Sequence, residues 1–235
     1  MSTKVVACAT VIEEILPLLS PTISCEVLDF GLHSNPENLR LMLQQAIDAV
    51  GEEIETLVLG YGLCSMAVVG LKATTCRLVV PRVDDCIAIF LGSTRAYQQQ
   101  ARQEPGTYYL TKGWIKAADT PFEEYDRLVE RYGLERADRM MGLLLKNYTR
   151  LAFIDTGQHR QEHYRAYARL TAGRFNLRYE EIPGSTALVR KMLYGPWDED
   201  FIVVRPGETL RYTDFKNAVP RPCNAPAGNA EAADG

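Results

Sequence analysis

Runs of continuously hydrophobic residues alternate with amphipathic segments along most of the chain, and this alternation constrains the fold more than any other feature. Examples are the runs KVVACAT, ETLVLGYG and CRLVVPRV. Strands that are hydrophobic along their whole length and separated by helices are typical of parallel sheets covered on both faces. The sequence therefore predicts an α/β fold with a parallel, doubly wound sheet.

The same pattern divides the chain into two Rossmann-like α/β halves joined by a helical segment. We expect the N-terminal half at residues 1–118, the helical connector at 119–150 and the C-terminal half at 151–218. Residues 219–235 are rich in Pro, Ala, Gly and Asn, so we expect a disordered tail there. The pattern leaves open whether the two halves form one sheet or two.

Bulk composition excludes several classes of protein. The 235 residues carry a formal net charge of −4, and no basic stripe is present that could bind the phosphate backbone of a nucleic acid. No apolar run approaches the roughly 20 residues of a membrane span. The N-terminal segment enters a predicted strand at once, so we expect no signal peptide and a cytoplasmic protein. In that compartment the six cysteines are expected to be catalytic or metal-binding rather than disulfide-bonded.

Three of the cysteines follow the predicted strands at the same edge of the sheet. Cys8 closes the first strand, Cys64 follows the third and Cys86 follows the fourth. Parallel sheets bind ligands beyond the carboxyl ends of their strands, so these thiols are candidates for one site. Three thiolates suit Zn²⁺ or a [4Fe–4S] cluster with one iron left open. The alternative is that each cysteine packs as a small hydrophobe.

The remaining cysteines and the neighbouring glycines receive other interpretations. Gly60 and Gly62 flank the turn before Cys64 and would let the backbone approach a bound group closely, although glycine is also common at any strand-to-helix turn. We interpret the three other cysteines as structural or without a role: Cys25, Cys76 and Cys223.

Polar side chains near the same strand ends are candidate substrate-binding or catalytic groups. Arg82 could hold a carboxylate in a bidentate fork, and Asp84, followed by Asp85, could act as a base. An Arg–Asp pair that fixes the loop is the alternative. Asp155, in the stretch FIDTG, is expected to cap a helix or contact a ligand, since aspartic protease chemistry requires a second aspartate.

A second group of candidates would line the ligand. His33 follows the second strand, and it could join the site or simply precede a helix cap. Lys112 and Trp114, in YYLTKGW, could form a cationic and aromatic wall over a cofactor.

The stretch HRQEH matches the H-x-x-E-H pattern of a class of zinc peptidases. On a helix, His159 and His163 would share a face. The pattern also requires a glutamate ligand from a later helix, and no glutamate falls in the one later helix that we predict. A peptidase is therefore a lesser alternative to the cysteine site.

Several stretches together resemble a family of uncharacterised bacterial and archaeal proteins classed as a domain of unknown function. They are HSNPENLRLMLQQAID, LVLGYGLC, VVPRVDDCIAIFLGS, YYLTKGW, FIDTG and VVRPG. The resemblance implies that Cys8, Cys64 and Cys86 recur in the family. It also implies a link to corrinoid-dependent methyltransferases, near which members are often encoded. This chain differs where the family has Gly-Asn-Gly after Cys64 and His-Asp-Cys ending at Cys86.

These observations lead to an expected function and its alternatives. We expect a metal-centre protein, and favour an enzyme of anaerobic or one-carbon metabolism that acts on a small molecule at a [4Fe–4S] cluster or Zn²⁺. A corrinoid protein or methyltransferase is the expected partner. A non-catalytic metal or cofactor chaperone for a partner enzyme is the alternative.

Overall fold

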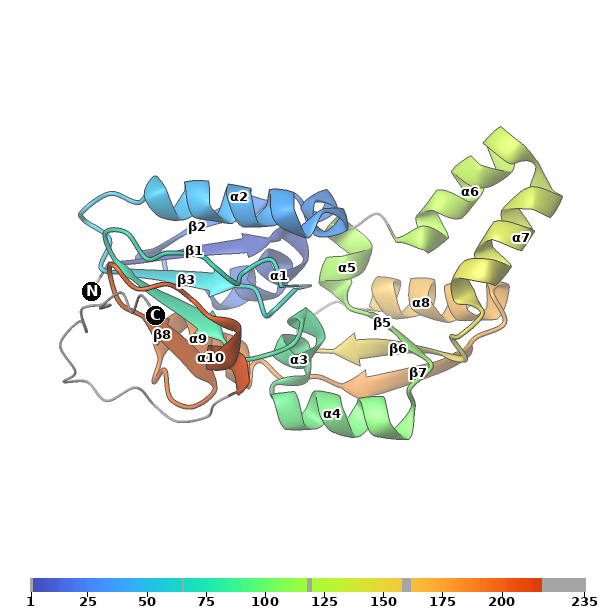
Figure 1. The fold of residues 1–235 in the computed structure, drawn as a ribbon. Helices are drawn as coiled ribbons and strands as arrows, with labels where there is room; N and C mark the ends of the chain where they lie inside the picture. The colour runs from blue at the N-terminus through green and yellow to red at the C-terminus, as the bar shows by residue number, and fades with distance from the viewer. Residues whose placement is uncertain (1, 65, 118–119, 158–161, 217–235) are drawn as a thin grey trace, which may run out of the picture.

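A five-stranded sheet forms the centre of the computed structural model, which describes residues 2–64, 66–117, 120–157 and 162–216 (Figure 1). Its strand order is β2-β1-β3-β4-β8. The strands are β1 (Thr3–Cys8), β2 (Ile23–Leu28), β3 (Thr56–Gly60), β4 (Arg77–Pro81) and β8 (Phe201–Val204). The first four are parallel, whereas β8 pairs antiparallel with β4. The predicted α/β fold with a mostly parallel sheet is confirmed, and the antiparallel edge strand is the difference.

A second, smaller sheet lies beside the first. It has the order β5-β6-β7 and is entirely parallel, with β5 at Thr107–Leu110, β6 at Arg150–Asp155 and β7 at Arg178–Pro183. The chain leaves the first sheet after β4, builds the second sheet and returns with β8. As a result β5, from the N-terminal part of the chain, lies in the second sheet, and β8, from the C-terminal part, lies in the first.

Helices cover both faces of the first sheet. In Figure 1 α2 lies over one face, while α9 packs on β3 and β4 from the other. The α-helices are α1 (Ala9–Ile15), α2 (Pro36–Asp48), α3 (Cys86–Leu91), α4 (Thr94–Gln103), α5 (Lys112–Ala117), α6 (Pro121–Tyr132), α7 (Leu134–Leu145), α8 (Glu162–Arg174), α9 (Ala187–Tyr194) and α10 (Tyr212–Lys216). Two 3₁₀ segments are η1 (Leu16–Leu18) and η2 (Phe30–Ser34).

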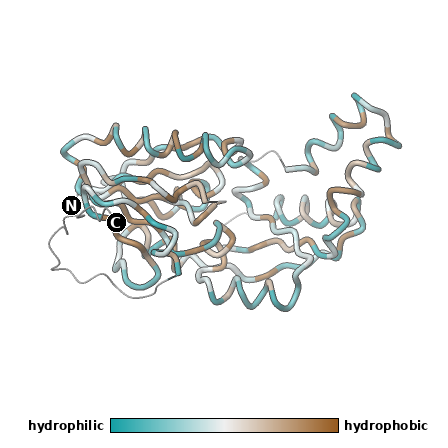
Figure 2. The backbone as a smooth tube through the Cα atoms, in the orientation of Figure 1, coloured by the Kyte–Doolittle hydropathy of each residue, from teal (hydrophilic) through white to brown (hydrophobic). Residues whose placement is uncertain are grey.

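The hydrophobic residues gather on the strands, as the brown segments of Figure 2 show. Alternate residues of β6 serve two cores, because side chains of a strand point to opposite faces. Ala152 and Ile154 belong to the core around the first sheet, whereas Leu151 and Phe153 belong to the core under α6, α7 and α8. The two sheets therefore share one continuous hydrophobic core on one side of β6.

The sequence pattern predicts a single helix over residues 88–103, and this prediction is wrong, because the structure has two helices there. Gly92 ends α3 with a φ of 83°, a left-handed conformation that favours glycine. The Ser93 hydroxyl then accepts a hydrogen bond from the Ala96 N–H at 3.1 Å and begins α4. The predicted helix also began two residues too late, since α3 starts at Cys86.

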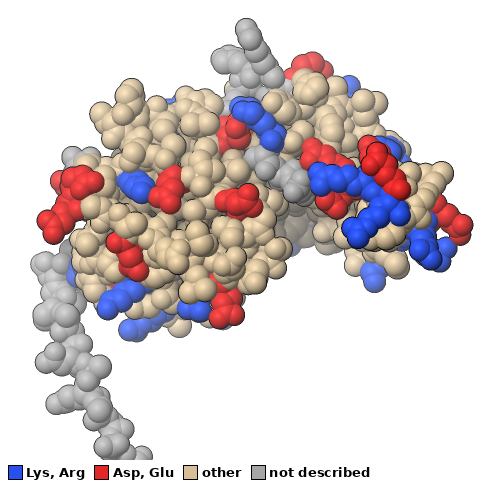
Figure 3. Space-filling view, turned by 90° about the horizontal axis from the view of Figure 1, so that it is seen from above, with Lys and Arg blue, Asp and Glu red and all other residues tan. Residues whose placement is uncertain are grey.

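The helices α6 and α7 pack together as a hairpin that projects from the second sheet (Figure 1). On the face seen in Figure 3, acidic and basic side chains are interspersed and are densest over this end of the molecule. That face carries no broad patch of a single sign. The predicted tail at 219–235 lies outside the described residues.

The order of the first sheet defines where a ligand would be expected. From β1 the chain moves outward to β2 and then returns to the other side of β1 to form β3, so the direction of winding reverses between β1 and β3. In open α/β sheets ligands bind at such a switch point, beyond the carboxyl ends of the strands. Cys8 ends one of these two strands and the Cys64 loop follows the other.

Candidate functional site

The three predicted thiols lie at or just after the ends of three adjacent strands, at this edge of the sheet. Cys8 is the last residue of β1, Cys64 lies in the loop after β3, and Cys86 is the first residue of α3, after β4. The thiols are near enough to perturb one another electrostatically. After burial, the proximity of Cys8 is the next largest cause that raises the pKa of both Cys64 and Cys86, and Cys64 raises the pKa of Cys86 further.

Two backbone hydrogen bonds join the loop that carries Cys64 to the loop that precedes Cys86. The N–H of Leu63 donates to the Val83 carbonyl at 2.9 Å, and the N–H of Cys64 donates to the Asp84 carbonyl at 3.1 Å. Gly62 makes this approach possible, since a Cβ there would lie 2.6 Å from the Val83 oxygen. This contact brings the loop of Cys64 close to the loop that leads to Cys86.

The space beside both predicted glycines is filled by protein. A Cβ at Gly60 would lie 2.6 Å from the Cβ of Ala7, its neighbour across the β1–β3 pair. In this structure Gly60 and Gly62 therefore allow close contact between protein segments, which positions the loop that follows them.

Cys64 has a backbone conformation that is rare for its residue type. Its φ is 42°, and that of Met66 is 73°. Left-handed φ values at residues other than glycine cost free energy and cluster at binding and active sites. A turn holds this conformation, with the Ala67 N–H donating to the Cys64 carbonyl at 3.2 Å. The unfavourable backbone conformation therefore lies at Cys64, one of the three predicted metal ligands.

Burial holds all three thiols in the neutral form at neutral pH. It raises the pKa of Cys8, of Cys64 to about 12, and of Cys86 well above its usual value. For Cys8, hydrogen bonds from the backbone N–H groups of Val11 and Thr10 partly oppose this effect. A bound cation reverses the balance, because it favours the deprotonated ligand.

The donor chemistry of this cluster fits a thiophilic metal, whereas its geometry is not yet that of a ligand set. Among the described residues no group of three or more His, Cys, Asp or Glu side chains is arranged to hold a metal ion. All five cysteines in the described part of the chain are free thiols. Because metal–sulfur bonds are about 2.3 Å long, binding would require the three sulfur atoms to draw together.

Tyr61 is the residue of this site that sequence reasoning missed. Its side chain is 1% exposed and its hydroxyl has no hydrogen-bond partner among the described residues. Burial raises the pKa of Tyr61, and the charges of the three cysteines Cys8, Cys64 and Cys86 raise it further. A tyrosine between two glycines at the end of a buried strand was the available signal.

His33 and Trp114 belong to a group of aromatic side chains that adjoins Tyr61. The His33 ring stacks on Tyr61 at 5.9 Å and on Phe30 at 4.9 Å, measured between ring centroids. Its Nδ1 lies 2.9 Å from the Phe30 carbonyl oxygen, and burial lowers its pKa, so the imidazole is neutral at pH 7. Trp114 meets Phe30 and Phe90 edge-on at 6.5 Å and 6.1 Å. Two of the predicted cofactor-binding residues thus lie in the aromatic surroundings of the thiols.

Asp85 carries the carboxyl group at the start of α3, next to Cys86 in the chain. Its charge raises the pKa of both Cys64 and Cys86, and its carboxylate caps α3 by accepting a hydrogen bond from the Ile87 N–H at 2.9 Å. Asp84, the predicted base, has an exposed side chain. Its backbone carbonyl accepts the hydrogen bond from the Cys64 N–H.

The guanidinium of Arg82 is bound to the segment that contains β8. It donates to the backbone carbonyls of Glu199 at 2.9 Å, Phe201 at 3.2 Å and Asp214. These contacts fix the loop that Arg82 begins, as in the alternative considered for this arginine.

The other predicted residues lie on different elements. Asp155 ends β6 in the second sheet, pairs with Arg165 and accepts a hydrogen bond from the Gly157 N–H at 2.9 Å. Lys112 begins α5 and lies 3.7 Å from a carboxylate oxygen of Glu13. His163 is exposed on α8, and His159 lies outside the described residues, as does Cys223.

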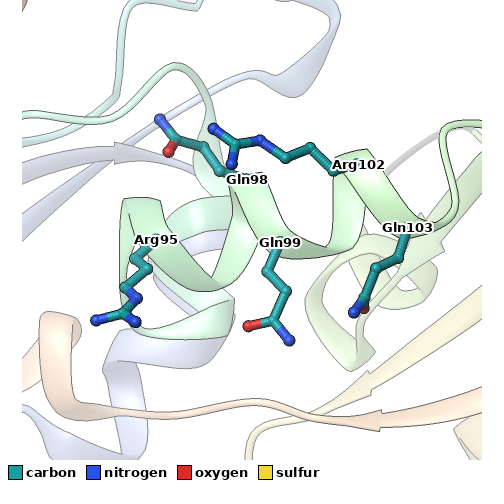
Figure 4. Close-up of a pocket in the computed structure, with 5 residues that line it drawn as sticks. All are labelled: Arg95, Gln98, Gln99, Arg102 and Gln103. Carbon is teal, nitrogen blue, oxygen red and sulfur yellow. The ribbon is translucent and has the colours of Figure 1, made fainter.

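A surface pocket of the molecule has a different location. Its five lining residues all belong to α4, and none is a predicted site residue (Figure 4). They are Arg95, Gln98, Gln99, Arg102 and Gln103.

Within the described residues, no helix is both long enough and apolar enough to cross a membrane.

Comparison with known proteins assigns the chain to a family. No curated protein and no solved structure matches it. A family model described as "protein of unknown function (DUF1638)" matches residues 27–193, more than half of the chain. The match includes Cys64 and Cys86 and begins after Cys8. The chain therefore belongs to the DUF1638 family, whose function the family description leaves open.

Proposed function

We propose that Cys8, Cys64 and Cys86 bind a metal centre and that the protein is an enzyme acting on a small molecule there. The observation that carries this proposal is the placement of the three cysteines at or just after the carboxyl ends of the adjacent strands β1, β3 and β4, at the switch point of the first sheet. A [4Fe–4S] cluster is the first choice, since three ligands leave one iron open, and Zn²⁺ is the second. Either centre supplies a Lewis-acid position for a substrate or activates a thiol for methyl transfer.

The residues around the thiols would exclude water and orient the substrate. The side chain of Tyr61 is buried, as are most side chains of α3, including Phe90. His33 stacks on Tyr61 and adds a neutral imidazole to these residues. Asp85 would hold the start of α3, and therefore Cys86, in place. Arg82, Asp84 and Asp155 stay predictions as substrate-binding groups.

Burial of the thiols favours an enzyme over the alternative of a metal or cofactor chaperone. A chaperone has to release its cargo and needs exposed, exchangeable thiolates. Cys8 is 1% exposed and Cys86 9%, and Cys64 is half-buried. The resemblance to proteins encoded near corrinoid-dependent methyltransferases supports a corrinoid protein or methyltransferase as the partner, in the reducing environment of the cytoplasm.

Metal analysis of protein purified without oxygen tests the proposal. We expect iron with a broad visible absorption band, or one zinc per chain, in the unmodified protein. Cys8→Ser, Cys64→Ser and Cys86→Ser should each lose most of the metal, because a three-ligand site tolerates no missing thiolate.

Matched controls are the two cysteines on other parts of the sheet, Cys25→Ser and Cys76→Ser, which should retain the metal. Absence of metal from the unmodified protein, even after iron and sulfide or zinc are supplied during refolding, would disprove the proposal. Equal metal loss in the control variants would place the metal elsewhere.

A further inference from the structure

A patch of exposed hydrophobic side chains lies on α7, in the hairpin that projects from the second sheet (Figure 1). Its members are Met140, Leu143 and Leu144, which are 44%, 66% and 52% exposed. Residues three and four positions apart are neighbours on a helix surface, so the three side chains are contiguous. Single exposed hydrophobic residues are common on protein surfaces, whereas contiguous groups of them mark interaction sites.

The patch is separate from the face that α7 uses inside the molecule. Ala137, Met141 and Leu145 recur at every fourth position and are buried in the core under α6, α7 and α8. Met140 and Leu144 each precede one of these buried residues, so they form a second row, turned by about 100° around the helix axis. A helix that is apolar on two sides is expected to bury both. Within the described residues, only one side of α7 is covered.

Basic side chains follow one edge of the patch, and we call them the cationic row. They are Arg136, Arg139 and Lys146, all of them exposed. Together with Leu143 they follow the chain at steps of three, four and three residues, which is the spacing of one row on a helix. Glu135 pairs with Arg139 at 3.0 Å, but both side chains are exposed, and such pairs contribute little. Neither Arg136 nor Lys146 has a charge partner among the described residues.

The cationic row disfavours a second copy of this chain as the occupant of the patch. Most soluble oligomers are symmetric, and two-fold dimers are the commonest. If two α7 helices packed antiparallel across the patch about a two-fold axis, both cationic rows would lie on the same side of the interface. Like charges brought together across an interface cost free energy. A partner with acidic residues beside its apolar face would instead neutralise the row.

We infer that the patch and the cationic row form a docking surface for a partner protein, which presents an amphipathic helix with acidic residues along one flank. Apolar faces of this kind commonly bind the apolar side of an amphipathic helix, and charges at the edge select the partner. The inference does not depend on the thiol site, which belongs to the first sheet.

Fluorescence anisotropy with two synthetic helical peptides tests the inference. The acidic probe has leucines at helical spacing and glutamates along one flank, and the basic probe has lysines in place of the glutamates. We expect the full-length protein to bind the acidic probe more tightly than the basic one. Added salt should weaken the binding of the acidic probe, because exposed charges are screened. Leu143→Ser should weaken it by about 10-fold, since one leucine no longer becomes buried on binding.

Two further variants provide the controls. Leu170→Ser removes a leucine that is 75% exposed on a different helix, α8, and it should bind the acidic probe like the unmodified protein. The double variant Arg136→Glu with Lys146→Glu should bind the basic probe more tightly than the acidic one. All the substituted side chains are exposed, so denaturant unfolding should show nearly unchanged stability in each variant.

Several outcomes would overturn the inference. One is that neither probe binds, and another is that Leu143→Ser and Leu170→Ser bind the acidic probe equally well. A dimer of the unmodified protein that dissociates in Leu143→Ser would show that a second copy covers α7. Binding to vesicles of anionic lipid that is lost in Leu143→Ser would assign the patch to a membrane surface instead.

Discussion

At the scale of single residues, the arrangement of the thiols depends most directly on the absence of a side chain at Gly62. Val83 occupies the space that a Cβ would need: its carbonyl oxygen would lie at 2.6 Å and its Cγ2 at 2.8 Å. Both are part of the loop that leads to Cys86. A change of one methyl group therefore acts on the contact between the two cysteine loops.

We predict that Gly62→Ala lowers the free energy of unfolding by about 1–3 kcal/mol, the usual cost of forcing an extra carbon into a packed site. It should also weaken Zn²⁺ binding, because the loops move apart. Denaturant unfolding and chelator competition measure the two effects. Gly142→Ala is the matched control: its Cβ meets nothing within 4 Å in α7, so it should stabilise the protein by about 0.5–1 kcal/mol. Equal behaviour of the two variants would contradict the packing explanation.

At the scale of secondary-structure elements, a buried carboxyl group joins α1 to the second sheet. Glu14 lies on α1 and is 1% exposed. It accepts hydrogen bonds from the Thr156 hydroxyl at 2.7 Å, after β6, and from the Gly113 N–H at 3.4 Å, on α5. The two helices are in close contact there, since a Cβ at Gly113 would lie 2.3 Å from the Thr10 carbonyl oxygen. Because α1 begins directly after Cys8, this junction supports the first thiol.

The stability of this junction should depend on pH. Burial raises the pKa of Glu14 above that of the unfolded chain, so folding favours the protonated carboxyl. The contribution of Glu14 to stability is therefore complete below its unfolded pKa and is lost as the pH rises through its folded pKa. Glu14→Gln, which is neutral at every pH, should remove this dependence. Denaturant unfolding at a series of pH values should show the unmodified protein losing stability relative to the variant as the pH rises from acid to neutral; parallel curves would refute the assignment.

At the scale of the whole molecule, the last strand closes the first sheet through Arg82. Besides its three side-chain bonds to carbonyls of the C-terminal segment, its own N–H donates to the Asp200 carbonyl at 2.7 Å. The chain returns from the second sheet to reach this position. Arg82 thus joins the loop after β4, which leads to Cys86, to the C-terminal segment that contains β8 and α10.

We predict that Arg82→Ala lowers the free energy of unfolding by about 2–3 kcal/mol, since hydrogen bonds from a charged donor are among the stronger ones and three carbonyls lose theirs. The metal content should not change, because the cysteine loops do not depend on this side chain. Unfolding curves and metal analysis of the same preparation check both statements. Full stability with loss of substrate turnover would instead support the role in substrate binding.

Much of the element order could be predicted from the local pattern of residues. The strands at β1, β3 and β4 and the helices at α2 and α6 follow from hydrophobic runs and helix start signals such as Asn35, which caps α2. These are local features, because backbone hydrogen bonding and side-chain periodicity act over a few residues. The division at Gly92 was missed, although glycine and serine stood together there, since a helical pattern on both sides concealed it.

The sequence by itself determined that Cys8, Cys64 and Cys86 follow parallel strands, and parallel strands end at one edge. Only the tertiary structure decided that β1, β3 and β4 are neighbours, that β8 returns to the first sheet, that His33 stacks on Tyr61, and that the Arg82 side chain donates to backbone carbonyls of the C-terminal segment. The physical reason is the range of the interactions. Strand order and side-chain contacts depend on burial between segments far apart in the chain, which no local pattern records.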